Sequence, residues 1–389
     1  MLHNINSKKQ FNKKIVIITG ELSGEIHAYH VIKRMKTSFD FEFSGIGSRK
    51  LEELGVSIIH DYRDISIMGI HEIFPKLKNI WTAFSKIKKH LKNNRPSLLI
   101  LVDFPGFNIR VARMAKKYNI PVIYFIPPQI WAWRQGRIKI IKKYVDRVIC
   151  ILPFEKKLYD EYNIKVSYVG HPFVRTIKPL FGKEEFFENI GLISKKPVIT
   201  VMPGSRNNEI RKHMPILIKV IEKIVDTFNE AAILLPLADG IDQEVIEAFN
   251  TNNIKINYLR DLNYDALSYC DIAIMASGSA TVEAAILGTP TIVIYKVSKI
   301  SYFFAKFLVK TKYISLPNII SDKEVFPEII QHLDPEKIAE EALNMLNKVN
   351  PENNEELIKI RSKLGNMDSY EMTKNTIIDF LEETYGTLS

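Results

Sequence analysis

The sequence is poor in cysteine and lacks any hydrophobic run long enough to cross a bilayer. Its 389 residues include two cysteines, Cys150 and Cys270, each of which follows an apolar run. Two thiols in such positions predict neither a disulfide framework nor a metal-ligand set. No apolar run approaches the roughly 20 residues that a transmembrane helix needs. Residues 1–14 are polar and basic and lack the apolar core of a signal peptide. These absences together predict a cytoplasmic protein.

Several common catalytic and cofactor signatures are also missing. We find no P-loop, no H-E-x-x-H and no G-x-S-x-G pattern. Gly45-Ile46-Gly47 does not extend to a dinucleotide fingerprint, because Lys50 stands where the third glycine should be. Asp261 and Asp265 are spaced too widely for a D-x-D metal motif. The sequence therefore argues against a nicotinamide oxidoreductase, and we expect neither a metal ion nor a cofactor. A diphosphate leaving group would then be stabilised by protein groups rather than by Mg²⁺.

The composition is that of an ordinary globular protein with an excess of positive charge. Hydrophobic residues make up 46% and charged residues 25%, which argues against a disordered chain. Because single cores rarely grow beyond about 250–300 residues, this length predicts two domains. The net charge of +10 indicates an anionic partner: a nucleic acid, a phosphorylated substrate or an acidic membrane. Charge alone does not choose among these three.

Short, β-branched apolar runs alternate with amphipathic stretches along the chain. Because these runs are apolar throughout, they indicate parallel sheets covered on both faces. The polar segment Arg175–Lys196 separates two series of runs. We therefore predict two open α/β sheets in tandem, with a ligand cleft at their strand C-terminal ends. The predicted strands of the first series are Lys14–Thr19, Phe41–Gly45, Ser57–His60, Leu98–Val102, Val122–Ile126, Arg147–Leu152 and Ser167–Gly170, and those of the second are Val198–Met202, Ala232–Leu237, Ile254–Leu259, Ile272–Ala276 and Thr291–Tyr295.

Three loops of the first half follow strands and carry candidate functional residues. Gly20–Glu25 comes directly after the first strand, where a plain turn and a ligand-facing loop would both fit. Asp103 follows an apolar run and would act either as a general base or as the cap of the next helix. Trp131 and Trp133 lie in a proline-braced loop, where they would either pack internally or stack on a sugar or acyl group.

Two loops of the second half have the chemistry of a nucleotide site. Pro203–Arg206 offers backbone N–H groups and an arginine fork to a phosphate, although Arg206 would also suit an exposed surface. Ser277–Ala285 opens a helix, and its small hydroxyl residues predict an anion site at the helix N-terminus. Glu283 would accept hydrogen bonds from ribose hydroxyls or complete a capping box with Ser279 or a neighbouring residue.

Two stretches combine basic and aromatic residues and contain no acidic residue. The first lies between Glu72 and Asp103 and has apolar residues at helical spacing, and the second spans residues 296–312. Both are typical of basic amphipathic segments on an anionic membrane, or of core-facing helices with a solvated basic back. No RNP, KH or zinc-finger pattern supports nucleic-acid binding. The basic residues are Lys76, Lys78, Lys86, Lys88, Lys89, Lys92 and Arg95 in the first stretch, and Lys296, Lys299, Lys306, Lys310 and Lys312 in the second.

Taken in order, these motifs resemble the lipid-A-disaccharide synthase family, whose members have the two-domain glycosyltransferase fold called GT-B. The resemblance extends from about Ile15 to Gln331. Each block is short, and the specificity of the match lies in the number and order of the blocks. Beyond the loops already named, the blocks are Gly45-Ile46-Gly47, Ser66–Ile70, Pro153–Glu155, Val169–Pro172 and Ser315–Asn318.

The resemblance implies a fold and a reaction. Two Rossmann-like, doubly wound parallel-sheet domains would comprise residues 1–180 for the acceptor and residues 181–360 for the UDP-sugar, with residues 361–389 as a helix crossing back to the first domain. The implied donor is UDP-2,3-diacylglucosamine, and the implied acceptor is 2,3-diacylglucosamine 1-phosphate. The acceptor's 6-hydroxyl would attack the donor's anomeric carbon, giving a β-1,6 disaccharide and UDP with inversion. Because both substrates are membrane lipids, the enzyme would bind anionic lipids peripherally, on the cytoplasmic face of a Gram-negative inner membrane.

The resemblance also implies roles for particular residues. Asp103 would be the catalytic base, and Arg206 would face the UDP diphosphate. The acceptor side would include Ser23, Asn108 and Trp131. The UDP-binding residues would be Gly204, Ser205, Arg206, Ser277, Gly278, Ser279, Ala280, Thr281, Glu283 and Asn318.

Three positions depart from the family pattern. Glu25 stands where Asp is usual, His27 where a small residue is usual, and Ser48 where glycine is usual. The sequence assigns no role to Glu25 or His27, and it leaves the oligomeric state open.

Two competing interpretations remain at this point. Another GT-B enzyme, such as a peptidoglycan-precursor glycosyltransferase or a UDP-sugar 2-epimerase, would differ in its acceptor, and the block Trp131–Arg134 favours the lipid A enzyme. A non-catalytic protein that binds a membrane or a nucleic acid would use the basic face alone. Such a protein would need neither Arg206 nor Glu283.

Overall fold

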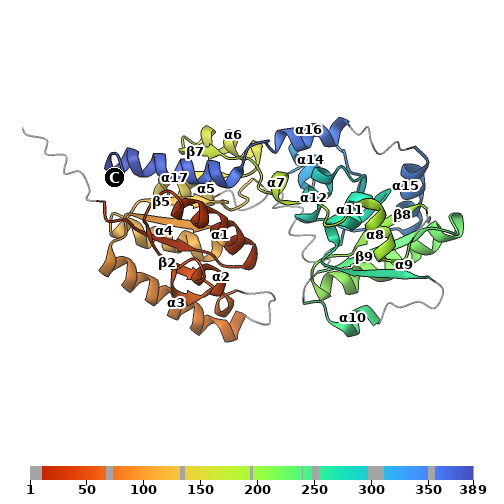
Figure 1. Ribbon diagram of the computed structural model, residues 1–389, viewed down its shortest axis with the longest axis horizontal. Helices are drawn as coiled ribbons and strands as arrows, with labels where there is room; N and C mark the ends of the chain where they lie inside the picture. The colour runs from red at the N-terminus through yellow and green to blue at the C-terminus, as the bar shows by residue number, and fades with distance from the viewer. Residues whose placement is uncertain are drawn as a thin grey trace, which may run out of the picture. The chain divides into compact units, whose positions relative to one another are not determined.

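The chain divides into two compact units. The computed structural model describes residues 11–66, 73–131, 136–192, 196–238, 240–247, 254–296, 311–348 and 355–388. The first unit comprises Met1–Pro172 together with Met367–Ser389, and the second comprises Phe173–Asn366 (Figure 1). The second unit is therefore an insertion between two parts of the first.

A seven-stranded parallel sheet forms the centre of the first unit, in the order β3-β2-β1-β4-β5-β6-β7. The order of the strands reverses between β1 and β4, and in such sheets ligands bind at the strand C-termini beside this reversal. The strands are β1 (Lys14–Ile18), β2 (Glu42–Gly47), β3 (Ser57–Asp61), β4 (Leu98–Val102), β5 (Val122–Phe125), β6 (Arg147–Cys150) and β7 (Val166–Tyr168).

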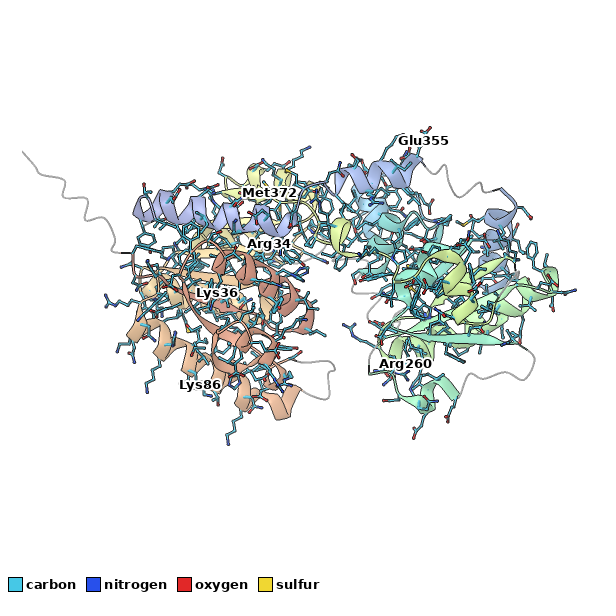
Figure 2. The ribbon with its side chains drawn as sticks, viewed as in Figure 1. Arg34, Lys36, Lys86, Arg260, Glu355 and Met372 are labelled. Carbon is cyan, nitrogen blue, oxygen red and sulfur yellow. The ribbon has the colours of Figure 1, made fainter. Side chains whose placement is uncertain are left out.

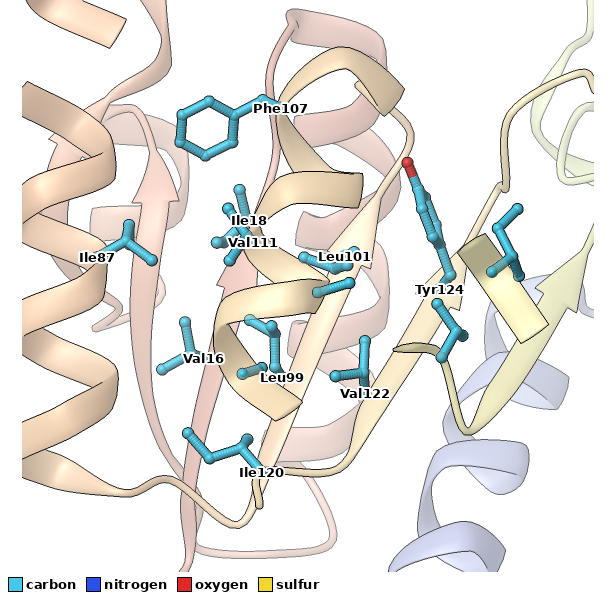
Figure 3. Close-up of a cluster of buried hydrophobic side chains, with 14 of the residues drawn as sticks. Val16, Ile18, Ile87, Leu99, Leu101, Phe107, Val111, Ile120, Val122 and Tyr124 are labelled. Atoms are coloured by element: carbon cyan, nitrogen blue, oxygen red, sulfur yellow. The ribbon is translucent and has the colours of Figure 1, made fainter. Parts of the chain in front are cut away.

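Helices cover both faces of this sheet. On one face, alternate strand residues such as Val16 and Leu101 pack against Ile87 of α3 and Val111 of α4 (Figure 3). Fully burying an aliphatic side chain of this size is worth about 1.5–3 kcal/mol, so the layer is a main source of stability. The helices of the unit are α1 (Leu22–Lys36), α2 (Arg49–Glu52), the 3-10 turn η1 (Tyr62–Asp64), α3 (Ile73–Asn94), α4 (Pro105–Lys117), α5 (Arg137–Tyr144), α6 (Pro153–Glu161) and α17 (Ser369–Tyr385).

The helix α17 returns from the second unit and packs on α1. Arg34 of α1 forms an ion pair of 2.8 Å with Asp368, which caps α17, and lies beside this helix in Figure 2. His27 is hydrogen-bonded to the hydroxyl of Tyr370 at 3.0 Å. Burial, followed by the nearby His30, lowers the pKa of His27 to about 4, so this imidazole is neutral at pH 7. His27 therefore has a structural role, which is to attach the returning helix.

The second unit has a six-stranded parallel sheet in the order β10-β9-β8-β11-β12-β13. One face of this sheet packs against α9, α10 and α15 around residues such as Val201 and Ile274. The strands are β8 (Val198–Met202), β9 (Ala232–Leu237), β10 (Ile256–Arg260), β11 (Ile272–Ala276), β12 (Thr291–Tyr295) and β13 (Glu328–Ile330). The helices are α7 (Phe173–Thr176), α8 (Lys183–Asn189), α9 (Asn207–Thr227), α10 (Gln243–Glu247), α11 (Asn263–Tyr269), α12 (Ala280–Leu287), α14 (Leu316–Ser321), α15 (Pro335–Lys348) and α16 (Glu355–Lys363).

The predicted fold class of two doubly wound parallel sheets is confirmed. Each strand predicted from the sequence is present, with ends that shift by up to a few residues. The strand β13 was not predicted, because its short sequence Glu-Ile-Ile has too few apolar residues to stand out.

Candidate active site

The turn between β4 and α4 has a strained backbone that fixes Asp103. Asp103 and Phe104 have φ values of 45° and 46°, in the left-handed region that non-glycine residues seldom occupy. Each such residue costs on the order of 1–3 kcal/mol, and strain of this kind clusters at functional sites. The N-cap of α4 is Phe104 and has no side-chain cap bond, so Asp103 is not the helix cap considered from the sequence.

Two buried side chains hold the carbonyl oxygen of Asp103. The amide of Asn108 donates to this oxygen at 2.8 Å and to that of Val102 at 3.1 Å. The hydroxyl of Tyr124 donates to it at 2.7 Å, and Figure 3 shows the Tyr124 ring rising from β5 toward this turn. Asn108 is fully buried and so acts on the turn rather than at the surface.

The carboxyl group of Asp103 is poised to accept a proton near neutral pH. Burial, with the negative charge of Glu21 as the second cause, raises its pKa from 3.8 to about 7. The loop of Glu21 approaches closely because Gly20 has no side chain, and a Cβ there would lie 1.9 Å from the ring of Phe104. In the first turn of α1, the exposed Ser23 donates to the carboxylate of Glu21 at 3.1 Å. The structure thus places Ser23, Glu21 and Asp103 near one another beside the strand reversal.

Glu25 and Ser48 both depart from the family pattern, and they are hydrogen-bonded to each other. The buried carboxylate of Glu25 accepts hydrogen bonds from the backbone N–H and the hydroxyl of Ser48, the latter at 2.7 Å. Ser48 is in turn the N-cap of α2. Glu25 therefore connects α1 to the end of β2 and has a structural role.

Trp131 is held by residues of the first turn of α6. Its indole N–H donates to Oε1 of Glu155 at 3.1 Å, and its ring meets that of Phe154 edge-on at 5.0 Å. Burial is the main cause that raises the pKa of Glu155 to about 8. The other three residues of the block, which include Trp133 and Arg134, lie outside the described residues.

In the second unit, Glu209 of α9 contacts the loop that follows β8. The carboxylate of Glu209 accepts from the backbone N–H of Ser205 at 3.0 Å and forms an ion pair of 3.3 Å with Arg206. Gly204 has a φ of 135°, and a Cβ there would lie 2.6 Å from Glu209. The side chain of Arg206 is 70% exposed and caps no group of α9. Its guanidinium is thus accessible to an anion in solution.

The loop after β11 exposes small residues at the beginning of α12. Gly278 and Ser279 are exposed, and the hydroxyl of Thr281 donates back to the carbonyl of Gly278 at 2.7 Å. Ser279 is the N-cap and makes no side-chain cap bond, so the capping box with Glu283 is absent. Burial raises the pKa of Glu283 to about 7. The flanking residues Ser277 and Ala280 are half-buried.

Asn318 is engaged entirely by protein groups. Its amide nitrogen donates to the carbonyl of Phe326 and to Glu328, and its oxygen accepts from the backbone N–H groups of Val325 and Phe326. The side chain is fully buried. A direct bond from this amide to a nucleotide, as the resemblance implied, does not fit this geometry.

Three residues near these loops were not singled out from the sequence. Glu21 lies within a quoted motif, Glu155 ends another, and His213 lies one helical turn after Glu209. None has a distinctive local pattern, since their importance comes from contacts with other elements.

The two doubly wound parallel sheets define the GT-B class of fold, in which glycosyltransferases and sugar-nucleotide epimerases both occur. Solved structures agree on this fold. The UDP-GlcNAc 2-epimerase of Neisseria meningitidis, determined with UDP-GlcNAc bound, covers 94% of this chain and 100% of its own at a TM-score of 0.61 and 12% identity. A glycosyltransferase from Rickettsia africae covers 97% and 99% at a TM-score of 0.56 and 14% identity.

The sequence comparisons are more specific. The model of the lipid-A-disaccharide synthetase family matches residues 15–378. The lipid-A-disaccharide synthase of Syntrophus aciditrophicus is 37% identical over 360 residues, covering 91% of this chain and 94% of its own. Lipid-A-disaccharide synthase 1 of Legionella pneumophila (strain Lens) is 38% identical over 322 residues, covering 82% and 84%. The chain belongs to the lipid-A-disaccharide synthetase family and is a hexosyltransferase that forms the lipid A disaccharide.

Proposed function

We propose that the enzyme transfers 2,3-diacylglucosamine from UDP to the 6-hydroxyl of 2,3-diacylglucosamine 1-phosphate, with inversion at the anomeric carbon. The observation that carries this proposal is the Asp103 carboxyl, which is fixed on a strained turn beside the strand reversal and has a pKa near 7. A general base works best when its pKa lies near the working pH.

In the proposed reaction, Asp103 accepts the proton of the acceptor's 6-hydroxyl. The hydroxyl oxygen forms a bond to the donor's anomeric carbon as the bond from this carbon to the UDP oxygen breaks. UDP leaves with the electron pair. The charge that develops on the diphosphate is stabilised by donors that are in place beforehand, and we expect no metal ion to be required.

We propose that the second unit holds UDP. Gly204 and Ser205 would offer backbone N–H groups to the diphosphate, and Arg206 would exchange its ion pair with Glu209 for the diphosphate charge. The N-terminal turn of α12 would bind the nucleotide through Ser277, Gly278, Ser279, Ala280 and Thr281. Glu283, when ionised, would accept hydrogen bonds from the ribose hydroxyls. The full set of internal bonds around Asn318 supports a role for this residue in fixing the beginning of α14.

We propose that the first unit holds the acceptor. Ser23 is exposed beside Glu21 and can donate to a sugar hydroxyl. Trp131 presents a held aromatic ring on which a sugar or acyl group can stack. Asn108 would contribute by fixing the turn that carries Asp103.

The helix α3 is the proposed membrane contact. Ala83, Ile87 and Leu91 face the core, whereas Trp81 is 78% exposed and Leu77 is 49% exposed. The same helix carries five exposed lysines, Lys78, Lys86, Lys88, Lys89 and Lys92. This arrangement suits an anionic leaflet. Among the described residues, no helix has the length and apolarity needed to cross a bilayer. We propose peripheral binding to the cytoplasmic face of the inner membrane; residues 297–310 of the second basic stretch lie outside the described residues.

The deciding experiment measures UDP release from UDP-2,3-diacylglucosamine, with and without 2,3-diacylglucosamine 1-phosphate. We expect release that depends on the acceptor and a disaccharide 1-phosphate as the product. Release without acceptor, or none with both lipids and folded protein, would overturn the proposed substrates. The same assay with other UDP-sugars would then identify the donor.

A further inference from the structure

His213 of α9 connects the C-terminal ends of two strands in the second sheet. It is buried, with 1% of its surface exposed. Its Nδ1 lies 2.6 Å from the carbonyl oxygen of Pro203, the residue that begins the loop after β8. The backbone N–H of Lys296, directly after β12, donates to its Nε2 at 3.2 Å. One imidazole therefore joins the ends of two strands.

These two partners determine the protonation state of the ring. A carbonyl oxygen can only accept, so Nδ1 must carry a hydrogen. A backbone N–H can only donate, so Nε2 must have a free electron pair. Only the neutral imidazole with its hydrogen on Nδ1 satisfies both contacts. A second proton would place the N–H of Nε2 against the N–H of Lys296 and break the contact.

The charges around His213 are mixed, and burial dominates. Burial is the largest cause that lowers the pKa of His213, and Lys212 and Lys296 act in the same direction. The bond to Pro203 and the carboxylate of Glu209 act in the opposite direction. The net shift is downward, which keeps the ring neutral at pH 7.

One face of α9 thus holds the loop after β8 from two sides. Glu209 and His213 are four residues apart and so lie one turn apart on the same helix face. Glu209 accepts a hydrogen bond from the N–H of Ser205, whereas His213 donates one to the carbonyl of Pro203. Pro203 is buried, so its carbonyl would lose its donor without His213, and an unsatisfied buried carbonyl is costly.

We propose that His213 is a positioning residue for nucleotide binding, whose neutral ring fixes the loop Pro203–Arg206 against the end of β12. The proposal rests on the proposed function in one respect, that this loop binds the diphosphate of UDP. It predicts that UDP affinity falls when His213 becomes protonated, because the N–H of Nε2 then repels the N–H of Lys296 and displaces the ring from the carbonyl of Pro203.

Two substitutions separate the two contacts. The side-chain nitrogen of asparagine can take the place of Nδ1, so His213→Asn keeps a donor for Pro203 and loses the acceptor for Lys296. Glutamine reaches further, so the oxygen in His213→Gln can accept from Lys296 while Pro203 loses its donor. We expect UDP affinity within about threefold of wild type for His213→Asn and about tenfold weaker for His213→Gln. Titration calorimetry with UDP measures both, and thermal unfolding checks that each variant is folded.

The pH dependence adds a second readout. UDP itself gains a proton in acid, so the comparison is between the profiles of wild type and His213→Asn from pH 5 to 8. We expect the wild type to lose more affinity toward pH 5 than the variant, which has no ring to protonate. Equal affinities and superimposable profiles for all three proteins would overturn the proposal. An equal loss in both variants would also overturn it, because it would indicate general packing.

A third measurement does not depend on UDP. Hydrogen exchange at the Lys296 amide should be faster in His213→Asn than in wild type and close to wild type in His213→Gln. If the wild type binds no UDP, the assignment of the loop to the diphosphate fails, while the exchange rates still report whether His213 joins the two strand ends. Unchanged exchange in His213→Asn would remove this connection.

Discussion

Replacing Asp103 with Asn tests the proposed base with little disturbance of the fold. Asn tolerates the left-handed backbone of this turn nearly as well as Asp. The hydrogen bonds from Asn108 and Tyr124 reach the carbonyl oxygen of residue 103 and survive the change. A general base contributes about 10²–10⁴-fold to the rate. We therefore expect kcat to fall by at least about 100-fold, while UDP affinity stays at the wild-type value.

The stability of this variant gives an independent check. The folded-state pKa of about 7 lies above the unfolded value of 3.8, so the native protein holds an extra proton between these pH values. Stability contributed by this group is therefore present in acid and is lost as pH rises toward 7. At 1.36 kcal/mol per pKa unit, the loss is at most about 4 kcal/mol, since the carboxyl is partly exposed. Asp103→Asn removes the charge, so it should be as stable as wild type at pH 4 and more stable at pH 8.

The assay is UDP release under saturating substrates from pH 5.5 to 9, together with denaturant unfolding at both pH values. Wild-type kcat should rise with pH through about 7, because the ionised carboxylate is the active form. Asp160→Asn, on the exposed surface of α6, is the matched control and should keep the wild-type profile. Turnover of Asp103→Asn within about threefold of wild type would refute the assignment of the base.

Arg206→Ala should weaken UDP binding by roughly 10-fold or more, because a charge-assisted contact to the diphosphate is lost; Arg211→Ala, on an exposed part of α9, is the control, and equal affinities would exclude the clamp. Glu283→Gln should bind UDP more weakly at pH 8 than wild type, and the difference should shrink below pH 7, where Glu283 itself is protonated; a difference that did not change with pH would argue against ribose contacts by the carboxylate. Trp81→Ser should reduce binding to anionic vesicles and Tyr162→Ser, the exposed aromatic control, should not; wild-type binding that did not weaken as salt rose would indicate apolar insertion alone. Activity should persist in EDTA, and a loss reversed by Mg²⁺ would contradict the metal-independent mechanism.

Most of the fold could be predicted from local sequence patterns, because parallel strands that are buried on both faces consist of continuous apolar runs. The strand β4 was predicted with its observed bounds, and the edge strand β13 was not, since an edge strand buries less and needs fewer apolar residues. Whether Asp103 was a base or a cap could not be decided from the sequence. The backbone angles and the N-cap at Phe104 decide against the cap, and burial together with the neighbouring Glu21 raises the pKa of Asp103.

Contacts between distant segments explain what could not be predicted. Glu25 and Ser48 are 23 residues apart, and His27 and Tyr370 are 343 residues apart. In the sequence, Glu25, Ser48 and His27 are separate departures from the family pattern, and only the structure shows the partner that explains each of them. In the same way, Asn318 suited a polar ligand contact by residue type, but its four hydrogen bonds to protein groups arise from the chain between Asn318 and Glu328.

The return of α17 to the first unit has a consequence for biosynthesis. The ribosome makes all of residues 173–366 after β7 and before the helix that α1 packs against. During that interval the first unit lacks Asp368 and Tyr370, and one side of α1 is without its cover. The inserted unit is contiguous and can complete its own core earlier, so the half of the enzyme that begins first at the ribosome is the one that matures last.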